Sequence, residues 1–345
     1  MLRLADGDQQ SFRNPFVTAV LVSHRCNARF GADFAAAAAR DGFDLELLVL
    51  PDNPEARIDD AIAARAEAAY FSGDVYPVFP KQFFSATRKA PGLKWLQVFN
   101  AGVDHPVFAT ILERGVRLTT AAGSTAEPIA QTAIAGMLYL ARNLPRWIAS
   151  QRSHRWEPMR APDLPRDLRG QVMVVYGLGQ IGTEIARLAR ALGLYVVGVR
   201  RNAGTAGHAD EIHTPDQFPE LLARCDWLVI ACPLTDQTRG MVNADLLAKL
   251  PRGTRVINIA RGEIVSEPAL IAALQSGHLA GAYLDVFAQE PLPGDSPLWD
   301  LPNVLVTPHN SRASAGNEAR VNAIFLDNLK RWARNQLLVN EITRI

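Results

Sequence analysis

Residues 171–201 constrain the fold of this chain more than any other part of the sequence. A short apolar run, Val-Met-Val-Val-Tyr, leads into Gly177-Leu-Gly179-Gln-Ile-Gly182, and apolar residues then recur at helical spacing. A strand, a G-x-G-x-x-G turn and a helix in that order are typical of a dinucleotide-binding unit. In such a unit the first glycine permits a tight turn, the second lets the backbone approach a pyrophosphate, and the third lets the helix pack closely on the sheet. The sequence therefore predicts a phosphate-binding turn at a helix N-terminus.

The end of the next apolar run, residues 194–199, indicates which dinucleotide is preferred. NAD-binding units usually place Asp or Glu there to accept hydrogen bonds from the ribose 2′-hydroxyl. This chain has Arg200 and Arg201 instead. A planar guanidinium can bind a 2′-phosphate through paired charge-assisted hydrogen bonds, whereas a carboxylate would repel it. We therefore expect NADP, with NADPH preferred and NAD possible. The alternative is two arginines that merely face solvent at the end of a strand.

Composition excludes several other classes of protein. The 345 residues are 48% apolar and carry a net charge of +1, which favours two domains with large cores and gives no basic surface for nucleic acid or an anionic membrane. No apolar run approaches the length of a membrane span, and the N-terminus lacks the pattern of a signal peptide. The cysteines form no CxxC pair and the histidines no ligand cluster, so we expect a cytoplasmic protein without a metal centre.

Apolar runs alternate with helical patterns on both sides of the glycine-rich turn. This alternation predicts the α/β class, with two Rossmann-like domains built on doubly wound parallel sheets. Before the turn, we expect strands near residues 16–22, 45–50, 68–71, 93–99 and 116–121, and helices near 32–40, 55–67 and, as one long helix, 127–150. From the turn onward, we expect strands near residues 172, 195, 227–231, 256–259, 282–286 and 304–307.

The last expected helix, residues 315–334, indicates how the domains are built from the chain. Its apolar face should pack back onto the first domain, because it carries Val321, Ile324, Phe325, Leu329 and Trp332. We therefore expect a discontinuous substrate domain of residues 1–120 and 311–345 and a dinucleotide-binding domain of residues 121–310. Ligands should bind beyond the carboxyl ends of the strands, in a cleft between the domains.

Three polar residues stand at or just beyond the ends of expected strands in the second half of the chain. Arg261 follows Val-Ile-Asn-Ile-Ala, Glu290 follows Leu-Asp-Val-Phe-Ala-Gln, and His309 follows Val-Leu-Val-Thr-Pro. Because the carboxyl ends of parallel strands share one edge, these side chains can converge on one site. Reduction of a 2-oxo acid needs such a set: a cation for the carboxylate, a histidine that donates a proton, and a carboxylate that orients the imidazolium. Taken singly, each could instead be an ordinary loop residue.

Several longer stretches carry motifs in a recognisable order. They are Gly177-Leu-Gly-Gln-Ile-Gly182, Cys232-Pro-Leu-Thr-Asp-Gln-Thr238, Asn258-Ile-Ala-Arg-Gly262, Ala280-Gly-Ala-Tyr-Leu-Asp285-Val-Phe with Glu290-Pro-Leu-Pro293, and Thr307-Pro-His309. With these stretches the chain resembles the D-2-hydroxyacid dehydrogenase family across the whole expected cofactor domain. The first third of the chain matches mainly through residues 100–104, Asn-Ala-Gly-Val-Asp.

The resemblance implies roles for individual residues. Arg261 would anchor the substrate carboxylate and carbonyl, His309 would be the general acid/base, and Glu290 would be its partner. Backbone amides around Ala101 and Gly102 would also hold the substrate, together with the loop 73–75 that includes Val75. The implied cofactor contacts are Asp285, at the nicotinamide carboxamide, and Gly177, Leu178, Gly179, Gln180, Ile181, Gly182, Arg200, Arg201, Cys232, Pro233, Thr238, Ile259 and Ala260.

Within the family, the chain is similar to the glyoxylate/hydroxypyruvate reductase branch that uses NADPH. The similar stretches are Ser153-His-Arg-Trp156-Glu-Pro, Ser296-Pro-Leu-Trp299 and the arginines at 200 and 201. This similarity implies reduction of a small 2-oxo acid to the D-2-hydroxy acid, in a homodimer formed through the cofactor domain with the helix of Trp147 at the interface. Trp156 and Trp299 could instead simply fill core or dimer contacts.

The chain departs from the family pattern at two places. Residues 129–131, Ile-Ala-Gln, stand where the family commonly has Val-Ala-Glu. After His309 the family usually has small residues and glycine, but here Asn310-Ser-Arg312 follows. Arg312 could reach a second carboxylate or a phosphate on the substrate, or it could face solvent.

Other functions are compatible with the same fold. Some relatives of this fold are transcriptional corepressors that bind dinucleotide and act as scaffolds. A formate-dehydrogenase-like enzyme is expected to carry Gln where this chain has Glu290. The intact Arg, Glu and His set favours a dehydrogenase, with a dehydrogenase of another small acid as a further alternative.

Overall fold

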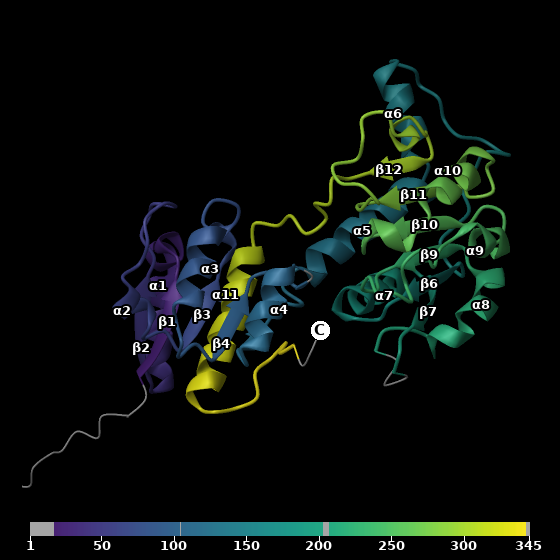
Figure 1. Cartoon of the computed structure of the whole chain (residues 1–345). Coiled ribbons are helices and arrows are strands. Elements are labelled where there is room, and N and C mark those ends of the chain that lie inside the picture. Colours follow the sequence, from purple (N-terminus) through teal and green to yellow (C-terminus); the bar gives the residue numbers. More distant parts are fainter. Residues whose placement is uncertain (1–16, 104, 203–206, 343–345) are drawn as a thin grey trace, which may run out of the picture. The chain divides into compact units, whose positions relative to one another are not determined.

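The computed structural model describes residues 17–103, 105–202 and 207–342 (Figure 1). The chain forms two compact units. Unit 1 comprises residues 1–124 and 316–345, and unit 2 comprises residues 125–315. The chain therefore passes from one unit to the other at 124/125 and at 315/316, where the sequence placed the domain boundaries at 120/121 and 310/311.

Unit 1 is built on a five-stranded sheet in the order β2-β1-β3-β4-β5, and every strand pair in it is parallel. Strands β3 and β4 are buried along their whole length, as is usual for a parallel sheet covered on both faces. The strands are β1 Val17–Val22, β2 Asp44–Val49, β3 Ala68–Phe71, β4 Trp95–Val98 and β5 Arg117–Thr119.

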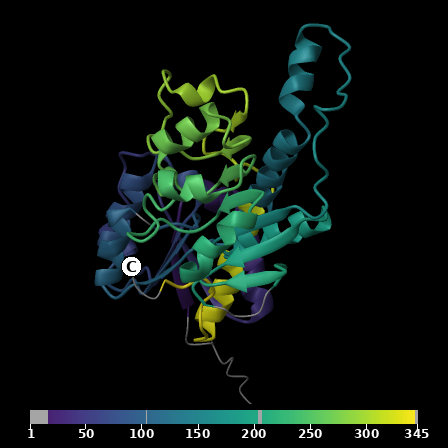
Figure 2. The ribbon, with the colours of Figure 1, turned by 90° about the vertical axis from the view of Figure 1, so that its right-hand side faces the viewer.

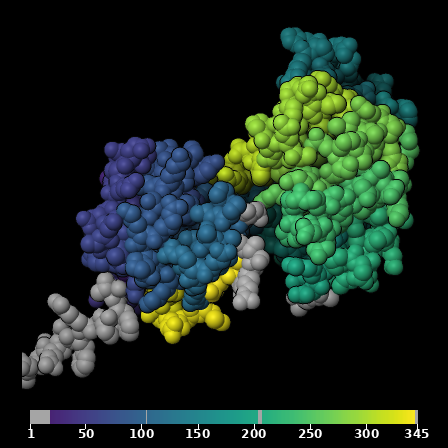
Figure 3. All heavy atoms as spheres, viewed as in Figure 1, coloured from purple at the N-terminus to yellow at the C-terminus, as the bar shows by residue number. Residues whose placement is uncertain are grey.

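Helices cover both faces of the unit 1 sheet. One face packs against α1 His24–Asp41 and α11 Asn317–Ala333, and the other packs against α2 Asp60–Ala63, α3 Pro80–Arg88 and α4 Pro106–Glu113. The Phe325 ring of α11 stacks on Tyr70 of β3 with ring centroids 4.1 Å apart. The expected return of the last helix to the first domain is therefore confirmed, and Figure 3 shows these C-terminal residues (yellow) against the blue surface of unit 1.

Unit 2 is built on a seven-stranded parallel sheet in the order β12-β11-β10-β9-β6-β7-β8. The strand order reverses between β6 and β9, which is the switch point of a doubly wound sheet. Both units thus confirm the expected fold class. The strands are β6 Val172–Tyr176, β7 Tyr195–Val199, β8 Glu211–His213, β9 Trp227–Ile230, β10 Arg255–Asn258, β11 Gly281–Leu284 and β12 Val304–Val306.

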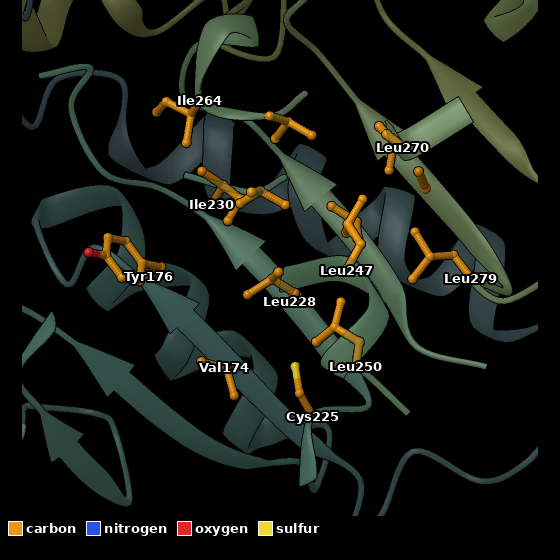
Figure 4. Packing of buried hydrophobic residues seen from close by; sticks show 14 of the residues in the cluster. Val174, Tyr176, Cys225, Leu228, Ile230, Leu247, Leu250, Ile264, Leu270 and Leu279 are labelled. Atoms are coloured by element: carbon orange, nitrogen blue, oxygen red, sulfur yellow. The ribbon is translucent and has the colours of Figure 1, made fainter. Parts of the chain in front are cut away.

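Two apolar layers stabilise unit 2. On one face, α5 Ala126–Ala141 and α7 Gln180–Ala191 pack on the sheet, and Tyr283 of β11 is fully buried there. On the other face, α8 Phe218–Leu221, α9 Ala244–Lys249 and α10 Glu267–Gln275 enclose a cluster of leucine, isoleucine and valine side chains (Figure 4). The remaining helical turns are η1 Gly73–Val75, η2 Pro215–Gln217, η3 Leu222–Arg224, η4 Gly262–Ile264 and η5 Pro297–Trp299.

The single helix expected over residues 127–150 is wrong. The segment forms two helices, α5 and α6 Leu144–Arg152, with Asn143 between them at a φ of 53°. Pro145 explains the break, because it has no N–H for a continued helix and its ring would clash with the carbonyl four residues earlier. Asparagine tolerates the left-handed conformation better than most residues, so it closes α5.

Candidate active site

The glycine-rich turn joins β6 to α7. Gly177 has a φ of 109°, and a Cβ there would lie 2.6 Å from the backbone of Ala231 and Cys232 at the end of β9. A Cβ on Gly182 would lie 2.0 Å from the Gly177 carbonyl oxygen. Both glycines are therefore required by the fold of the turn itself.

Gly179 differs from its two neighbours in the motif. It is exposed, it is the N-cap of α7 without a side-chain cap, and a Cβ on it would meet no atom within 4 Å. The first amides of a helix have no partner within the helix, and they carry the positive end of its dipole. Gly179 and the α7 amides thus form an open anion cradle, and a pyrophosphate fits the donor set. Of the other motif residues, Leu178 is buried, Gln180 is exposed and Ile181 is half-buried.

Arg200 and Arg201 follow β7 at the carboxyl edge of the same sheet. The Arg200 amide donates to the His213 carbonyl at 3.0 Å, which ties this end of β7 to β8. Among the described residues, no hydrogen bond or ion pair engages either guanidinium. The nearest acidic residue of β8, Glu211, lies at the other end of that strand, and the Arg224 guanidinium that donates to it holds the pKa of its carboxyl well below the usual range. Both cations are therefore available to an anionic ligand.

The loop after β9 contains three of the expected cofactor residues. Cys232 is buried, and burial raises the pKa of its thiol to about 11, so it is a neutral apolar group at physiological pH. The Thr238 hydroxyl donates to the Pro233 carbonyl at 2.8 Å and accepts from the Thr235 amide at 2.8 Å. Thr238 therefore shapes the loop, while Pro233 is exposed on it.

Arg261 follows β10 in a turn that its own neighbours stabilise. The Asn258 side chain accepts from the Ala260 amide and donates to the Arg261 carbonyl, both at 3.1 Å, and Arg261 Nη1 donates to the Ala260 carbonyl at 2.8 Å. A Cβ on Gly262 would lie 1.8 Å from the Phe287 carbonyl carbon. Gly262 therefore lets the turn that carries Arg261 contact the segment after β11. Ile259 and Ala260 are buried in this turn.

Asp285 follows β11 and is almost completely buried, with 1% of its surface exposed. Its Oδ1 accepts hydrogen bonds from Thr307 Oγ1 at 2.6 Å and from the Asn310 amide at 3.0 Å, and its Oδ2 accepts from Ser311 Oγ at 2.5 Å. The Tyr283 hydroxyl lies 3.0 Å from Thr307 Oγ1 and extends this network into the core. Every donor to the carboxylate belongs to the segment 307–311, so Asp285 fixes the backbone on both sides of His309.

His309 and Glu290 form the central pair of the site. His309 Nδ1 lies 2.7 Å from Glu290 Oε2, and Glu290 Oε1 accepts from the Phe287 amide at 3.0 Å. A carboxylate acceptor assigns the Nδ1 proton to this hydrogen bond, which leaves Nε2 for a ligand. The His309 and Glu290 side chains are 45% and 36% exposed, so the pair is open to solvent.

The structure brings the three expected catalytic residues to one edge of unit 2. Asn258 of β10 pairs in register with Leu284 of β11, and Leu284 pairs with Val306 of β12. Arg261, Glu290 and His309 follow these three neighbouring strands, which are spaced about 4.8 Å apart. A fixed cation, a directed imidazole and its carboxylate can hold an anionic substrate and transfer one proton.

The expected substrate residues Val75, Ala101 and Gly102 belong to unit 1. Val75 is fully buried in η1 and its amide donates to the Ser72 carbonyl at 3.1 Å, whereas Gly73 is exposed. Ala101 is exposed, and the Gly102 carbonyl accepts from the Asn100 side chain. In these two loops, Gly73 and Ala101 are therefore the residues that are exposed to solvent. Asp104, the last residue of the matching stretch, lies outside the described residues.

Sequence reasoning missed the residues that hold the site in place. Asn258, Thr307 and Ser311 have buried or half-buried polar side chains that fix the turns of Arg261 and His309. Asn258 and Thr307 lie within the family-like stretches, but nothing in their spacing indicates which atom they bind. Within the described part of the chain, no group of three or more His, Cys, Asp or Glu could hold a metal ion, and no helix is long and apolar enough to cross a membrane.

Comparison with protein families gives one match over half of the chain. A family model described as D-isomer specific 2-hydroxyacid dehydrogenase, NAD binding domain, matches residues 134–311. The matched region contains the glycine-rich turn, both arginines after β7, and the Arg261, Glu290 and His309 set.

Comparison with individual proteins gives the same group. A putative 2-hydroxyacid dehydrogenase of Haemophilus influenzae is 33% identical over 66% of this chain and 73% of its own length. A D-3-phosphoglycerate dehydrogenase of Methanocaldococcus jannaschii is 30% identical over 74% of this chain, but the match spans only 48% of that longer protein. A crystal structure from Xanthobacter autotrophicus Py2, a D-isomer specific 2-hydroxyacid dehydrogenase in complex with NADPH and MES, is 31% identical with a TM-score of 0.74, covering 94% of this chain and 98% of that one.

Proposed function

Because the chain belongs to the D-isomer specific 2-hydroxyacid dehydrogenase family, and is therefore an NAD(P)-dependent oxidoreductase, we propose that it uses NADPH to reduce a small 2-oxo acid to the D-2-hydroxy acid. The observation that carries this proposal is the His309–Glu290 pair at 2.7 Å, at the strand end next to the turn of Arg261. This pair supplies the proton that the reaction requires.

Arg261, His309 and Glu290 each have one role in the proposed reaction. Arg261 binds the substrate carboxylate and keeps C2 and its oxygen in place. When bound, the nicotinamide ring supplies a hydride, which C2 of the oxo acid accepts. His309 Nε2 gives its proton to the oxygen as negative charge develops there, so that one hydride and one proton convert the carbonyl into a hydroxyl. Glu290 accepts the hydrogen bond from Nδ1 and thereby orients the ring, so that Nε2 faces the substrate.

The cofactor preference rests on the charges at the carboxyl edge of the unit 2 sheet. The α7 amides that begin at Gly179 would donate to the pyrophosphate, and Arg200 and Arg201 would bind the 2′-phosphate. The Xanthobacter relative was crystallised with NADPH, which agrees with this assignment. Asp285 anchors the His309 segment, and it would contact the carboxamide of the nicotinamide when the cofactor is bound.

The substrate class is a small 2-oxo acid of the glyoxylate and hydroxypyruvate kind. The motif around Trp156, the Trp299 motif and the arginine pair after β7 support this branch. In unit 1, the backbone amides around Ala101 and Gly102 and the η1 loop that contains Val75 are the proposed substrate contacts of that unit.

The test is a screen of NADPH oxidation over 2-oxo acids, with NADH in parallel. The wild-type protein should reduce at least one small 2-oxo acid with a higher kcat/KM for NADPH. The variant His309→Ala should lose about 10²- to 10⁴-fold in kcat, because it lacks the proton donor. The variant should retain the NADPH affinity of the wild type, measured by fluorescence quenching, and this would show that it is folded. If His309→Ala keeps the full kcat, His309 is not the general acid.

The active enzyme is proposed to be a homodimer formed through unit 2. Helix α6 and residues 153–169 extend away from the unit 2 sheet (Figure 2). They expose large apolar side chains, with Trp156 at 96%, Leu164 at 59% and Trp147 at 42%. A second copy of the chain would cover these side chains.

A further inference from the structure

A free guanidinium lies on the segment that carries the proposed acid. Arg312 is exposed, three residues after His309, and the described part of the chain offers it no hydrogen bond or ion pair. Of the other arginines at this edge, Arg261 is engaged by the Ala260 carbonyl, and Arg200 and Arg201 follow β7, which is separated from β12 by four strands. Arg312 therefore differs from a surface arginine that stabilises its own fold.

The backbone around Arg312 is held at several points. The Ala313 amide donates to the Asn310 carbonyl at 2.9 Å, so Ser311 and Arg312 are the central residues of a tight turn. The Ser311 side chain is buried and donates to Asp285, and its carbonyl accepts from Thr132 Oγ1 of α5 at 3.2 Å. The turn is thus fixed on its inner side, and Arg312 is its outward corner.

The charge of Arg312 is not needed by the buried carboxylate beneath it. All the hydrogen bonds that Asp285 accepts come from hydroxyl groups and backbone amides. At most about 11 Å of chain separates the Cα atoms of His309 and Arg312, and the turn shortens this distance. If the 2-oxo group of a substrate lies at His309, the long side chain of Arg312 can therefore reach a second group of that substrate a few bonds away.

We propose that Arg312 selects 2-oxo acids that carry a second anionic group, a carboxylate or a phosphate, at the end opposite the 2-oxo acid function. This inference rests on the proposed reduction of a 2-oxo acid, and it shifts the preferred substrate from monoanions such as glyoxylate and hydroxypyruvate to dianions. Arg261 holds the first carboxylate, and Arg312 binds the second anion through its planar fork of donors. The chemistry at C2 is unchanged, because Arg312 acts only on the distal group.

The test compares matched pairs of acids in the wild-type protein. Pyruvate and oxaloacetate differ by a distal carboxylate, and hydroxypyruvate and its 3-phosphate differ by a distal phosphate. The wild type should show at least about tenfold higher kcat/KM for a dianionic member than for its monoanionic partner. Arg312→Gln should lower kcat/KM for that dianion by about 10- to 100-fold, the range for one charge-assisted contact, and change the monoanion less than twofold. The pair that responds identifies the distal group as carboxylate or phosphate.

A matched control separates this contact from a general loss of positive charge. Arg252 is exposed in the turn before β10, at the opposite edge of the same sheet, and Arg252→Gln should leave both members of each pair unchanged. If Arg312→Gln lowers kcat/KM equally for both acids of a pair, or for neither, the inference about Arg312 is wrong. Activity of the wild type on the monoanion would still support the proposed function. Absence of turnover with every acid would overturn the proposed function and this inference with it.

Discussion

Asp285 shows how one buried carboxylate can organise a site without being its reactive group. His309 has a φ of 49°, a left-handed conformation that costs a non-glycine residue about 1 to 3 kcal/mol. The His309 amide donates to the Asp285 carbonyl at 2.8 Å, while the Asp285 carboxylate binds the two residues that follow. Asp285 thus accepts the hydrogen bonds that hold the strained backbone, and the imidazole is fixed before any ligand arrives.

Ser311→Ala tests this anchoring and leaves in place every residue that is proposed to contact a ligand. The variant removes a hydroxyl that donates to the Asp285 carboxylate, and the His309 segment should become less ordered. We expect kcat to fall about tenfold, which corresponds to about 1.4 kcal/mol, while NADPH affinity stays within twofold. The free energy of unfolding should fall by about 1 to 3 kcal/mol.

The control for this variant is Ser276→Ala at the end of α10. Its exposed hydroxyl donates to the neutral Ala273 carbonyl at 3.1 Å and accepts from the His278 amide at 3.5 Å, so kcat and stability should change little. A Ser311→Ala protein with wild-type kcat would show that the remaining donors to Asp285 hold the segment without this hydroxyl.

Arg200→Asp tests the assignment of the 2′-phosphate. The substitution replaces a guanidinium with a carboxylate, which repels a phosphate and accepts hydrogen bonds from ribose hydroxyls. The ratio of kcat/KM for NADPH to that for NADH should fall by at least about 100-fold. Steady-state kinetics with both cofactors measure it, and Arg252→Asp is the charge-matched control. An unchanged ratio would exclude Arg200 as the phosphate ligand.

At the scale of elements, local chemistry decides where helices end. The residues from 127 to 150 have the composition of one helix, and Pro145 together with Asn143 divides it into α5 and α6. The consequence is an independent α6 whose exposed Trp147 is free of the unit 2 core. Strand β8 was not expected from the sequence. Only its residues Glu211–His213 pair with β7, and three residues are too few to produce a recognisable pattern of apolar residues.

The apolar surface of α6 and residues 153–169 leads to a prediction about assembly. The wild-type protein should be a dimer by light scattering at micromolar concentration. Trp156→Ala should weaken dimerisation about 30-fold, because a buried aromatic anchor contributes about 2 kcal/mol to an interface. Ile62→Ser, on an exposed apolar residue of α2 in unit 1, is the control and should leave the dimer unchanged. A monomeric wild-type protein would contradict the prediction.

At the scale of the whole molecule, periodicity predicted most of the fold. Every expected strand has a counterpart in the two parallel sheets, since strands buried on both faces are continuous apolar runs. Helices α3 and α4 were not expected from the sequence. They have only nine and eight residues, and each begins with a proline, a residue that also marks loops. The sequence did not predict the strand orders. The structure gives β2-β1-β3-β4-β5 in unit 1 and β12-β11-β10-β9-β6-β7-β8 in unit 2.

Residues that are close along the chain encode the glycine-rich turn, the fold class and each of the candidates Arg261, Glu290 and His309. The contacts between atoms became visible only in the folded chain: Glu290 binds His309 Nδ1, Asp285 accepts from Thr307 and Ser311, and Arg312 lies at an anchored corner. These hydrogen bonds join segments that are far apart along the chain, and they depend on the exact distance and angle between donor and acceptor, which a local pattern of residues does not specify.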